Sequence, residues 1–436
     1  MHRIFRSFPV KDIAGTKMKM LNWASRFNIF CFLDDHGYAF PLHGQDVLLG
    51  AGVRHQYAPK PVMALAGLDD FLSRHRDWTL GHFAYDLKNE IEPMASSHPD
   101  LTGFGDIGLF VPEVLMTLSN GALSIGIHGE HHEAVLQEIL EAPKEASTPG
   151  LLEMGAIRHG KSEEDYVAII SSLHDHIRRG DCYELNFCME HVAENVRLDP
   201  VSVHAVLSQV SPNPFSALYR SGDAYLLCAS PERFLRRAGG RLHSQPVKGT
   251  APRHPSDPGQ DEASRLALSG SSKERSENVM VVDLVRNDLS RVCMEGSVQV
   301  DELFGVRSFP QVHQMVSTIS GIPDPALTFT DILRATFPMG SMTGAPKRRV
   351  MELIEHYEGF RRGLYSGAVG YFTPDGDFDL NVVIRSLLYH GKTGRLSFPT
   401  GSGITFYADA RREYAECLLK ASAMQQALER AAGKGP

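Results

Sequence analysis

Hydrophobic positions recur at helical spacing in the chain beyond residue 160. Tyr166, Ile170, Leu173 and Ile177 share one helical face, and a capping signal at residues 162–165 precedes them. The same reasoning predicts helices that begin at Asp199-Pro200 and that cover residues 272–284, 345–357 and 409–430. The second part of the chain is therefore expected to contain several clear helices.

Short apolar runs bounded by turn residues indicate strands, above all in the first 140 residues. Residues 27–33, which end at the turn signal of residues 34–37, and residues 122–127 are two examples. We expect few long helices in this part. Further strands are predicted at residues 224–228, 234–237, 367–371, 380–384 and 395–398. Because hairpins and helices mix without a steady strand–helix–strand rhythm, the pattern predicts an α+β fold.

A polar segment rich in proline and glycine, residues 141–150, separates these two parts and is the best candidate for a linker. We therefore expect a strand-rich N-terminal region at residues 1–145. A second region, at residues 155–430, carries the candidate chemistry described below.

Composition and charge exclude several classes of function. The net charge of −8 and the lack of basic runs with interleaved aromatic residues argue against a nucleic-acid partner. No segment has the length and apolar character of a membrane span, and the N-terminus lacks the apolar core of a signal peptide. The six cysteines show no paired or metal-ligand spacing, so we expect reduced, mostly buried thiols in a cytoplasmic protein.

Lys248, in the stretch Pro246–Thr250, is oddly placed for a solubilising charge. It lies between a proline and a Gly-Thr turn, and Glu232 precedes it by one strand–turn–strand unit. A nucleophilic amine beside an acid that protonates a leaving group is an arrangement for covalent catalysis. The alternative is a hairpin lysine next to a surface glutamate.

Two predicted helices each carry a pair of carboxylates at a spacing of three residues, which places both members on one face. The residues are Glu274 and Glu277 on one helix, and Glu413 and Glu416 on the other, where Lys420 follows one turn later. Solvated surface acids are the plain alternative. Carboxylates together with water and a ligand oxygen are how proteins commonly hold Mg²⁺, so these pairs are candidate metal ligands.

Glycine-rich and cationic positions could bind anionic groups. Residues 340–347 and 400–404 form glycine-rich turns whose backbone amides suit a carboxylate or phosphate. Arg385 follows an apolar strand, where its charge needs an anion, either a ligand or a structural salt-bridge partner. Tyr365 precedes a strand entry. Together with the acidic pairs, these residues suggest a pocket for a small dicarboxylate.

In this order, the motifs resemble those of the chorismate-utilising enzymes, the family of the large subunits of anthranilate synthase and aminodeoxychorismate synthase. The stretches are SPERF (230–234), PVKGTAPR (246–253), KERSENVMVVDLVRND (273–288), GSMTGAPK (340–347), YSGAVGY (365–371), IRS (384–386) and GSGI (401–404), followed by the Glu413 helix. The resemblance covers about residues 180–420 and is looser before them. It implies an anthranilate-synthase-like fold, with two mixed or antiparallel sheets in a sandwich, outer helices and an active-site cleft. The N-terminal region would be intertwined with the catalytic one.

A few positions indicate the branch of the family. Lysine at position 248 resembles the pattern of aminodeoxychorismate synthases, whereas anthranilate synthases have alanine at the matching position. Glu184 stands where isochorismate and salicylate synthases have a water-activating lysine. Residues 32–35 match the tryptophan-binding element of anthranilate synthases poorly, so tryptophan inhibition is not expected. Gln314 replaces a frequent histidine near the substrate ring, and it cannot take a proton at neutral pH.

The resemblance implies Mg²⁺-dependent amination of chorismate at C4 to 4-amino-4-deoxychorismate, a step toward 4-aminobenzoate and folate. No glutamine-hydrolysing domain is visible in the sequence, so ammonia is expected from a separate glutamine amidotransferase subunit. The chain ends without a lyase domain, so another enzyme is expected to remove pyruvate. The alternatives are an anthranilate synthase large subunit and an inactive relative that serves as a binding subunit.

The family pattern also implies roles for individual residues. Glu277 and Glu416, with Glu274 and Glu413 beside them, would hold the metal ion and the ring carboxylate. Gly401, Ser402, Gly403 and Lys420 would assist, Arg385 and Tyr365 would hold the enolpyruvyl carboxylate, and Thr250 and Gln314 would line the substrate site. Glu232 would protonate the departing hydroxyl and Lys248 would attack. We expect Mg²⁺, Lys420 and burial to lower the pKa of Lys248 from about 10.4.

Overall fold

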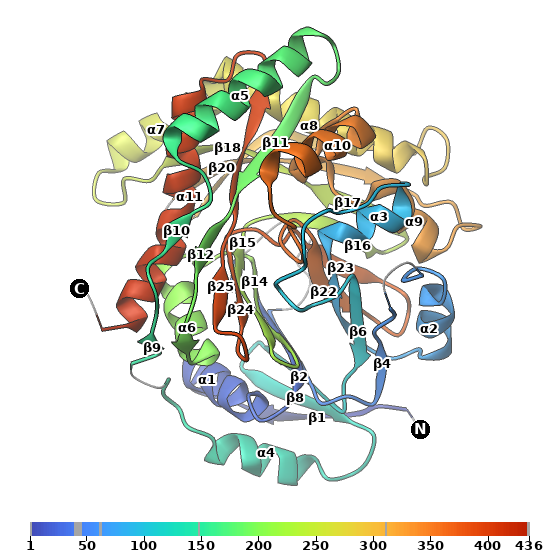
Figure 1. The fold of residues 1–436 in the computed structure, drawn as a ribbon. Helices are drawn as coiled ribbons and strands as arrows, with labels where there is room; N and C mark the ends of the chain where they lie inside the picture. The colour runs from blue at the N-terminus through green and yellow to red at the C-terminus, as the bar shows by residue number, and fades with distance from the viewer. Residues whose placement is uncertain (1, 39–45, 61–62, 147–148, 310–311, 434–436) are drawn as a thin grey trace.

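The computed structural model describes residues 2–38, 46–60, 63–146, 149–309 and 312–433 (Figure 1). Within them, two large sheets dominate, and all of their strand pairs are antiparallel. The first sheet has the order β1 (Ile4–Pro9), β8 (Ala122–Ile127), β7 (Val114–Ser119), β3 (Val47–Ala51), β2 (Ile29–Asp34), β14 (Phe215–Ser221), β15 (Ala224–Ser230), β24 (Ser386–His390), β25 (Arg395–Ser397), β12 (His191–Ala193) and β10 (Arg158–His159).

The second sheet has the order β18 (Val247–Pro252), β20 (Val312–Gly321), β17 (Arg241–Gln245), β16 (Arg233–Ala238), β23 (Phe378–Asn381), β22 (Ala368–Phe372), β5 (Thr79–Phe83), β6 (Ile107–Val111) and β4 (His55–Tyr57), and β19 (Gln299–Ser308) also pairs with β20. A smaller sheet joins β21 (Gly344–Ala345), β11 (Glu184–Met189) and β26 (Thr400–Thr405), and β13 (Arg197–Leu198) pairs with β9 (Leu151–Glu153).

Helices cover the outside of the sheets in Figure 1. They are α1 (Ile13–Ala24), α2 (Leu68–Arg74), α3 (Lys88–Ile91), α4 (His132–Glu141), α5 (Glu163–Arg178), α6 (Pro200–Val210), α7 (Pro258–Gly270), α8 (Ser272–Ser290), α9 (Phe329–Thr336), α10 (Lys347–Glu358) and α11 (Ala410–Ala431), with short 3₁₀ turns η1 (Tyr85–Leu87) and η2 (Gly340–Met342). None of these described helices is both long and apolar enough to cross a membrane.

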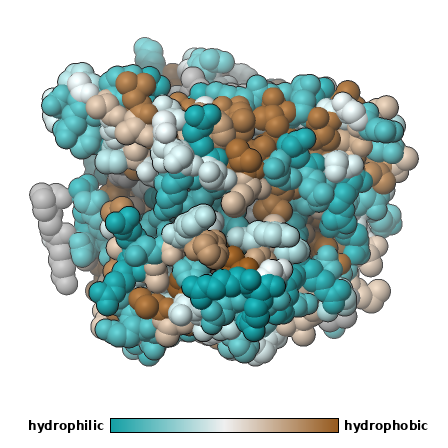
Figure 2. Space-filling view, turned by 90° about the horizontal axis from the view of Figure 1, so that it is seen from above, coloured by the Kyte–Doolittle hydropathy of each residue, from teal (hydrophilic) through white to brown (hydrophobic). Residues whose placement is uncertain are grey.

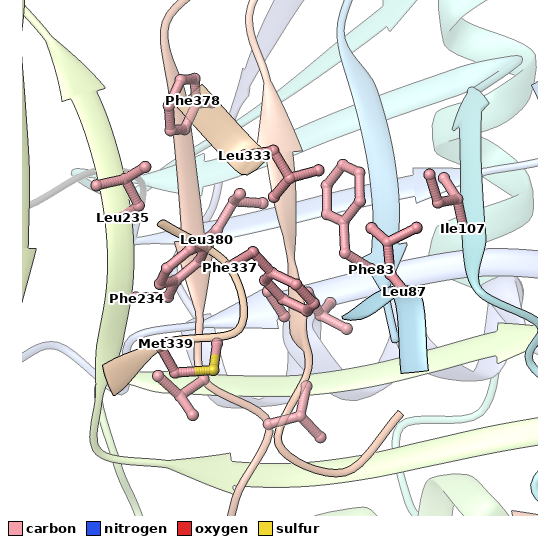
Figure 3. Packing of buried hydrophobic residues seen from close by; sticks show 14 of the residues in the cluster. Phe83, Leu87, Ile107, Phe234, Leu235, Leu333, Phe337, Met339, Phe378 and Leu380 are labelled. Carbon is pink, nitrogen blue, oxygen red and sulfur yellow. The ribbon is translucent and has the colours of Figure 1, made fainter. Parts of the chain in front are cut away.

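The core follows from the two-residue period of the strands. In β15, Leu226 and Cys228 belong to the hydrophobic cluster that both sheets share, whereas Leu227 belongs to the cluster of the first sheet with α1, α6 and α11. Burial on both faces explains why strand β3 is apolar throughout. The shared cluster extends across the second sheet to α9, where Phe234 and Phe337 have ring centroids 5.8 Å apart (Figure 3).

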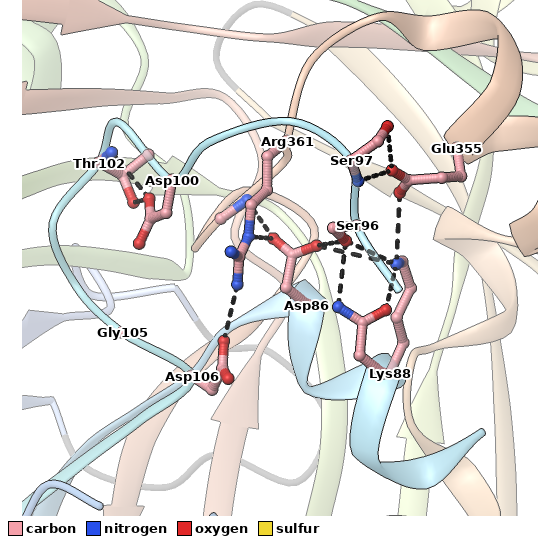
Figure 4. A network of polar contacts seen from close by, with 12 residues as sticks. Asp86, Lys88, Ser96, Ser97, Asp100, Thr102, Gly105, Asp106, Glu355 and Arg361 are labelled. Atoms are coloured by element: carbon pink, nitrogen blue, oxygen red, sulfur yellow. Dashed lines mark hydrogen bonds and ion pairs between the residues drawn. The ribbon is translucent and has the colours of Figure 1, made fainter. Parts of the chain in front are cut away.

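The N-terminal region contributes strands to both large sheets. Strand β2 pairs with β14, and β5 pairs with β22. A buried polar network adds a further link, because the Lys88 ammonium lies 3.5 Å from Glu355 and Arg361 lies 3.0 Å from Asp86 (Figure 4). The two regions are thus physically interlocked, and the division between residues 145 and 155 stays a prediction. Ser147 and Thr148 of the expected linker lie outside the described residues.

Local sequence signals predicted several helices well. Helix α5 begins at the predicted cap, where the Ser162 hydroxyl and the Asp165 carboxylate accept hydrogen bonds from each other's backbone amides. Helix α6 begins at Pro200, and the Asp199 side chain caps it. Helix α8 continues to Ser290, six residues beyond its predicted end.

One expectation of local structure was wrong. The first 140 residues contain few long helices, as expected, since α1 has 12 residues and α4 has 10. The strand predicted at residues 380–384 ends at Asn381, and the chain then turns, with Arg385 at a φ of 51°. That turn matters for the site described next.

The outer surface over the upper helices is mostly hydrophilic, with smaller hydrophobic patches between the polar residues (Figure 2). Some large side chains of the described chain are strongly exposed, among them Tyr407 and Leu419. The six cysteines are all buried and unpaired, as the sequence indicated.

Candidate active site

A cavity of about 730 Å³ opens between β18, β20, β26, α8 and α11. It collects every site residue predicted from the sequence except Ser402. Its lining includes Glu232, Lys248, Thr250, Glu274, Glu277, Gln314, Tyr365, Arg385, Gly401, Gly403, Glu413, Glu416 and Lys420. Residues that are up to 188 positions apart in sequence, Glu232 and Lys420, therefore share one site. The volume suits a small organic ligand.

Lys248 lies in strand β18 and not in a turn, which corrects the expectation from the sequence. The register against β20 shifts between Val247 and Thr250, so one extra residue bulges from the strand. Gly249 follows with a φ of 99°, and a Cβ there would lie 3.1 Å from the Glu274 carboxylate. The bulge explains why glycine follows the lysine, because it needs both a left-handed backbone and a close approach to α8.

The amine of Lys248 faces a carboxylate that the sequence did not reveal as a partner. Its Nζ lies 3.3 Å from Oε1 of Glu184 on β11; the Glu184 side chain is buried, and that of Lys248 is 12% exposed. A Cβ at position 403 would lie 2.7 Å from this Nζ, so glycine at 403 makes room for the amine. The lysine is thus enclosed by β11, β18 and β26.

The sequence led us to expect a lowered pKa for Lys248, but the charged groups of the protein itself raise this pKa. Burial alone would lower this pKa, but the carboxylates of Glu184, Glu277 and Glu416 outweigh burial and raise it above its usual value. The expectation included the neighbouring cation Lys420 and burial, but it did not include Glu184 across the cavity.

Glu232 is 4% exposed and lies just before β16. Its carbonyl accepts a hydrogen bond of 3.0 Å from the amide of Val382, so the loop before β16 is joined to the turn that carries Arg385. Burial raises the pKa of Glu232 to about 7, against the opposing effects of a hydrogen bond to Ser341 and the charge of Lys248. A carboxyl group with this pKa is well suited to donate a proton near neutral pH.

The four acidic residues of α8 and α11 face the cavity from two sides. Burial raises the pKa of Glu277 to about 7 and also raises those of Glu274 and Glu413. Burial acts in the same direction on Glu416, but Lys420, 2.7 Å away, keeps the pKa of Glu416 below its usual value. Like charges gathered in a partly dry site favour a bound cation.

As they are placed, no three His, Cys, Asp or Glu side chains of the described residues form a closed metal cage. Magnesium rarely needs one, because it keeps several waters and takes one or two carboxylates together with ligand oxygens. The carboxylates on α8 and α11 therefore fit an ion that is shared with a bound acid, and they do not fit an all-protein site.

Arg385 reaches the cavity from the turn after Val382 and Val383. Among the described residues, no carboxylate lies within ion-pair distance of its guanidinium group. Tyr365, 2% exposed, lines the same part of the cavity. The alternative of a structural salt bridge is therefore not supported, and an anionic ligand remains the partner that this partly buried guanidinium group requires.

Gly401 and Gly403 lie in strand β26 and not in a turn. They stand opposite Cys188 and Asn186 of β11, whose amides instead donate to Glu358 and to the Thr343 carbonyl. The Gly401 carbonyl accepts a hydrogen bond of 2.8 Å from Lys420. In an antiparallel strand the amide and carbonyl of one residue point the same way. We infer that both glycine amides point toward the cavity.

Ser402 points the other way. It stands opposite Phe187 in the register, and its hydroxyl lies 2.9 Å from the Tyr166 hydroxyl on the buried side of β26. Strand alternation separates it from its glycine neighbours. The structure therefore does not bring the Ser402 side chain into the cavity.

Two further residues support the site and were missed as members of it. Glu184 was considered only as a position that lacks lysine, although a glutamate within the alternating run Tyr183–Phe187 signals a buried acid that needs a partner. Asn278 is buried beside Glu277. Its side chain donates to the Lys248 carbonyl at 3.4 Å and accepts from Ser317 at 2.6 Å.

Residues 51–426 match the family model of chorismate binding enzymes. The chain belongs to this family, as its motifs indicated.

Curated relatives agree. The chain is 33% identical over 350 residues to aminodeoxychorismate synthase component 1 of Klebsiella aerogenes, covering 80% of this chain and 77% of that one. It is 42% identical over 272 residues to the probable chloroplastic aminodeoxychorismate synthase of Oryza sativa subsp. japonica, covering 62% of this chain. The match spans only 30% of that rice protein and 39% of the related Streptomyces griseus protein.

Solved structures show the same fold. The menaquinone-specific isochorismate synthase of Escherichia coli has a TM-score of 0.77 at 19% identity, covering 98% of this chain and 94% of that chain. Anthranilate synthase component I of Streptococcus pneumoniae has a TM-score of 0.70 at 24% identity, covering 96% and 92%. The predicted α+β, anthranilate-synthase-like fold is confirmed.

Proposed function

We propose that this protein is the large subunit of an aminodeoxychorismate synthase, which aminates chorismate at C4 with ammonia. The observation that carries the proposal is the amine of Lys248 in the same cavity as the buried acid Glu232. Relatives named aminodeoxychorismate synthase component 1 share most of the chain's length and support it. Residues 155–430 are assigned as the catalytic region, and residues 1–145 complete the sheets.

Chorismate is a dicarboxylate, and the cavity offers two places for its charges. Arg385 and Tyr365 would bind the enolpyruvyl carboxylate, because the guanidinium group has no protein anion among the described residues. The ring carboxylate would lie near Lys420 and the amides of Gly401 and Gly403. This arrangement would orient the ring between the amine of Lys248 and the carboxyl of Glu232.

Glu277 and Glu416, with Glu274 and Glu413 beside them, are proposed to hold Mg²⁺. When bound, the ion would offset the repulsion between these carboxylates and the ring carboxylate of the substrate. The spacing along α8 and α11 supports a site that is completed by the substrate.

In the proposed reaction, Glu232 donates its proton to the C4 hydroxyl, which leaves as water. The neutral amine of Lys248 adds at C2, and the ring double bonds shift. Ammonia then adds at C4, the double bonds shift back, and the bond from C2 to Lys248 breaks. The nitrogen added at C4 gives its surplus proton to the Glu232 carboxylate, which restores the acid. Gln314 and Thr250, which stand opposite each other on β20 and β18, would hydrogen-bond the substrate. Neither is a base at neutral pH, which fits a reaction without pyruvate elimination.

A separate glutamine amidotransferase subunit is proposed as the source of ammonia. Tyr183 precedes β11, and Phe406 and Tyr407 follow β26, at the end where Glu184 pairs with Thr405. These three aromatic side chains are 67%, 53% and 90% exposed, which is typical of a contact surface. The reduced, buried cysteines support a cytoplasmic location.

Product analysis tests this function. The protein is incubated with chorismate and Mg²⁺, with ammonium at alkaline pH in place of glutamine and the amidotransferase. The expected product is 4-amino-4-deoxychorismate, which an added aminodeoxychorismate lyase converts to 4-aminobenzoate. Direct formation of fluorescent anthranilate would instead identify an anthranilate synthase large subunit. Absence of any chorismate turnover would refute catalysis altogether.

A further inference from the structure

Glu184 is buried next to the amine of Lys248, and one of its two carboxylate oxygens has no hydrogen-bond partner among the described residues. Oε1 lies 3.3 Å from Nζ of Lys248, and the residue is 4% exposed. Within the described part of the chain, Oε2 is buried and has no hydrogen-bond partner. Such an oxygen is costly unless it is used, because a desolvated acceptor loses its bonds to water.

The fold fixes both members of this pair. Glu184 lies in β11, between β21 and β26, so its backbone is held on both sides. Lys248 lies in the bulge of β18, where Asn278 binds its carbonyl. Gly403 leaves the space between the two strands, because any Cβ there would lie 2.7 Å from the amine. The contact between Glu184 and Lys248 thus depends on three strands, β11, β18 and β26, which meet around Nζ of Lys248.

The proposed reaction, on which this inference rests, requires a proton acceptor for Lys248. Glu232 cannot serve, because it must keep its proton for the departing hydroxyl. Glu277 and Glu416 also act on the lysine through their charges, but these two glutamates are assigned to the metal ion. Among the described residues, Glu184 is the carboxylate that lies within ion-pair distance of Nζ.

We propose that Glu184 positions Lys248 and receives the proton that its ammonium group must lose before it attacks chorismate. One N–H bond of the ammonium breaks, one O–H bond forms on Glu184, and the freed electron pair of nitrogen bonds to C2. When ammonia bonds to C4 and the bond from C2 to Lys248 breaks, the proton returns from Glu184 to the departing amine. The two glutamates then have opposite tasks, since Glu232 donates a proton and Glu184 accepts one.

Glu184→Gln tests this role, because it keeps the shape of the side chain but removes its capacity to accept the proton. The full-length protein is mixed with chorismate and Mg²⁺ without ammonia, and covalent adduct on Lys248 is followed by intact mass and peptide mapping. Adduct formation should slow by about 10²-fold, a typical contribution of a general base. The Kd for chorismate should stay within about threefold, since Glu184 is not assigned to substrate binding.

Glu190→Gln is the matched control. Glu190 follows the same strand but pairs with Arg395 and Ser397 away from the cavity, so adduct formation should match the wild type. Glu184→Asp, which keeps a carboxylate at greater distance, should react at a rate between those of wild type and Glu184→Gln. A merely structural role would change the Kd for chorismate or the thermal midpoint and would not order the rates in this way.

The outcomes are separable. If the wild type forms the adduct and Glu184→Gln forms it at a rate within threefold of the wild type, the role of Glu184 is overturned. The proposed function would stay intact. The same conclusion follows if Glu184→Asp is no faster than Glu184→Gln. No adduct and no aminated product from the wild type would refute the proposed function, and with it this role.

Discussion

Replacing Glu232 by glutamine should stabilise the folded protein at alkaline pH while it slows the reaction. Burial raises the pKa of Glu232 from 4.5 to about 7, so the folded state retains a proton that the unfolded state releases. Between these pH values the folded state binds more protons, and its stability falls as pH rises. At ~1.4 kcal/mol per pH unit, the ionised carboxylate costs about 3 kcal/mol above pH 7. Glutamine, which is never charged, avoids this cost.

The assay is urea unfolding of wild type and Glu232→Gln at pH 8 and at pH 5. The variant should be more stable by up to about 3 kcal/mol at pH 8, and the gain should shrink toward pH 5, where the wild-type side chain is neutral as well. Glu352→Gln, on the outer face of α10, should change stability by less than about 0.5 kcal/mol at both values. Equal stability of wild type and Glu232→Gln at pH 8 would show that the carboxyl is not buried as described.

Three further predictions concern binding and geometry. Arg385→Met should raise KM for chorismate by about 10- to 100-fold, the value of a lost charge-assisted hydrogen bond, and steady-state kinetics would disprove the assignment if KM stayed constant. Gly403→Ala should displace the amine of Lys248 and lower kcat at least tenfold, whereas Gly270→Ala, where a Cβ meets nothing within 4 Å, should not; equal kcat values would contradict the packing. Removal of Mg²⁺ with EDTA should abolish turnover and weaken chorismate binding in calorimetry, and unchanged affinity would argue against a metal shared with the substrate.

Local signals in the sequence were sufficient to predict those helices and strands whose ends are determined by neighbouring residues. Short-range patterns of residues predict the cap at Ser162 and the strand at residues 122–127. The spacing of the glutamates within one helical turn predicts the carboxylate faces of α8 and α11. The family motifs added the list of residues that share the cavity. These parts could be predicted because each depends on short-range patterns or on motif identity.

The contact between Glu184 and Lys248 could not be predicted in this way. The two residues belong to different sheets, and only the assembled fold brings β11, β18 and β26 together. For the same reason the direction of the pKa change of Lys248 was wrong. Ser402 was also assigned to the cavity together with its neighbours, because a glycine-rich turn was expected where an alternating strand exists.

The central claim is that Lys248 becomes covalently bonded to the substrate during amination. The most direct test is intact mass analysis of the wild type and Lys248→Ala with chorismate and Mg²⁺, before and after ammonia is added. The wild type should gain the mass of chorismate less water on Lys248 and lose it when ammonia arrives, and Lys248→Ala should form no adduct and aminate at least about 10²-fold more slowly. Full amination by Lys248→Ala with unchanged kinetics would contradict the account.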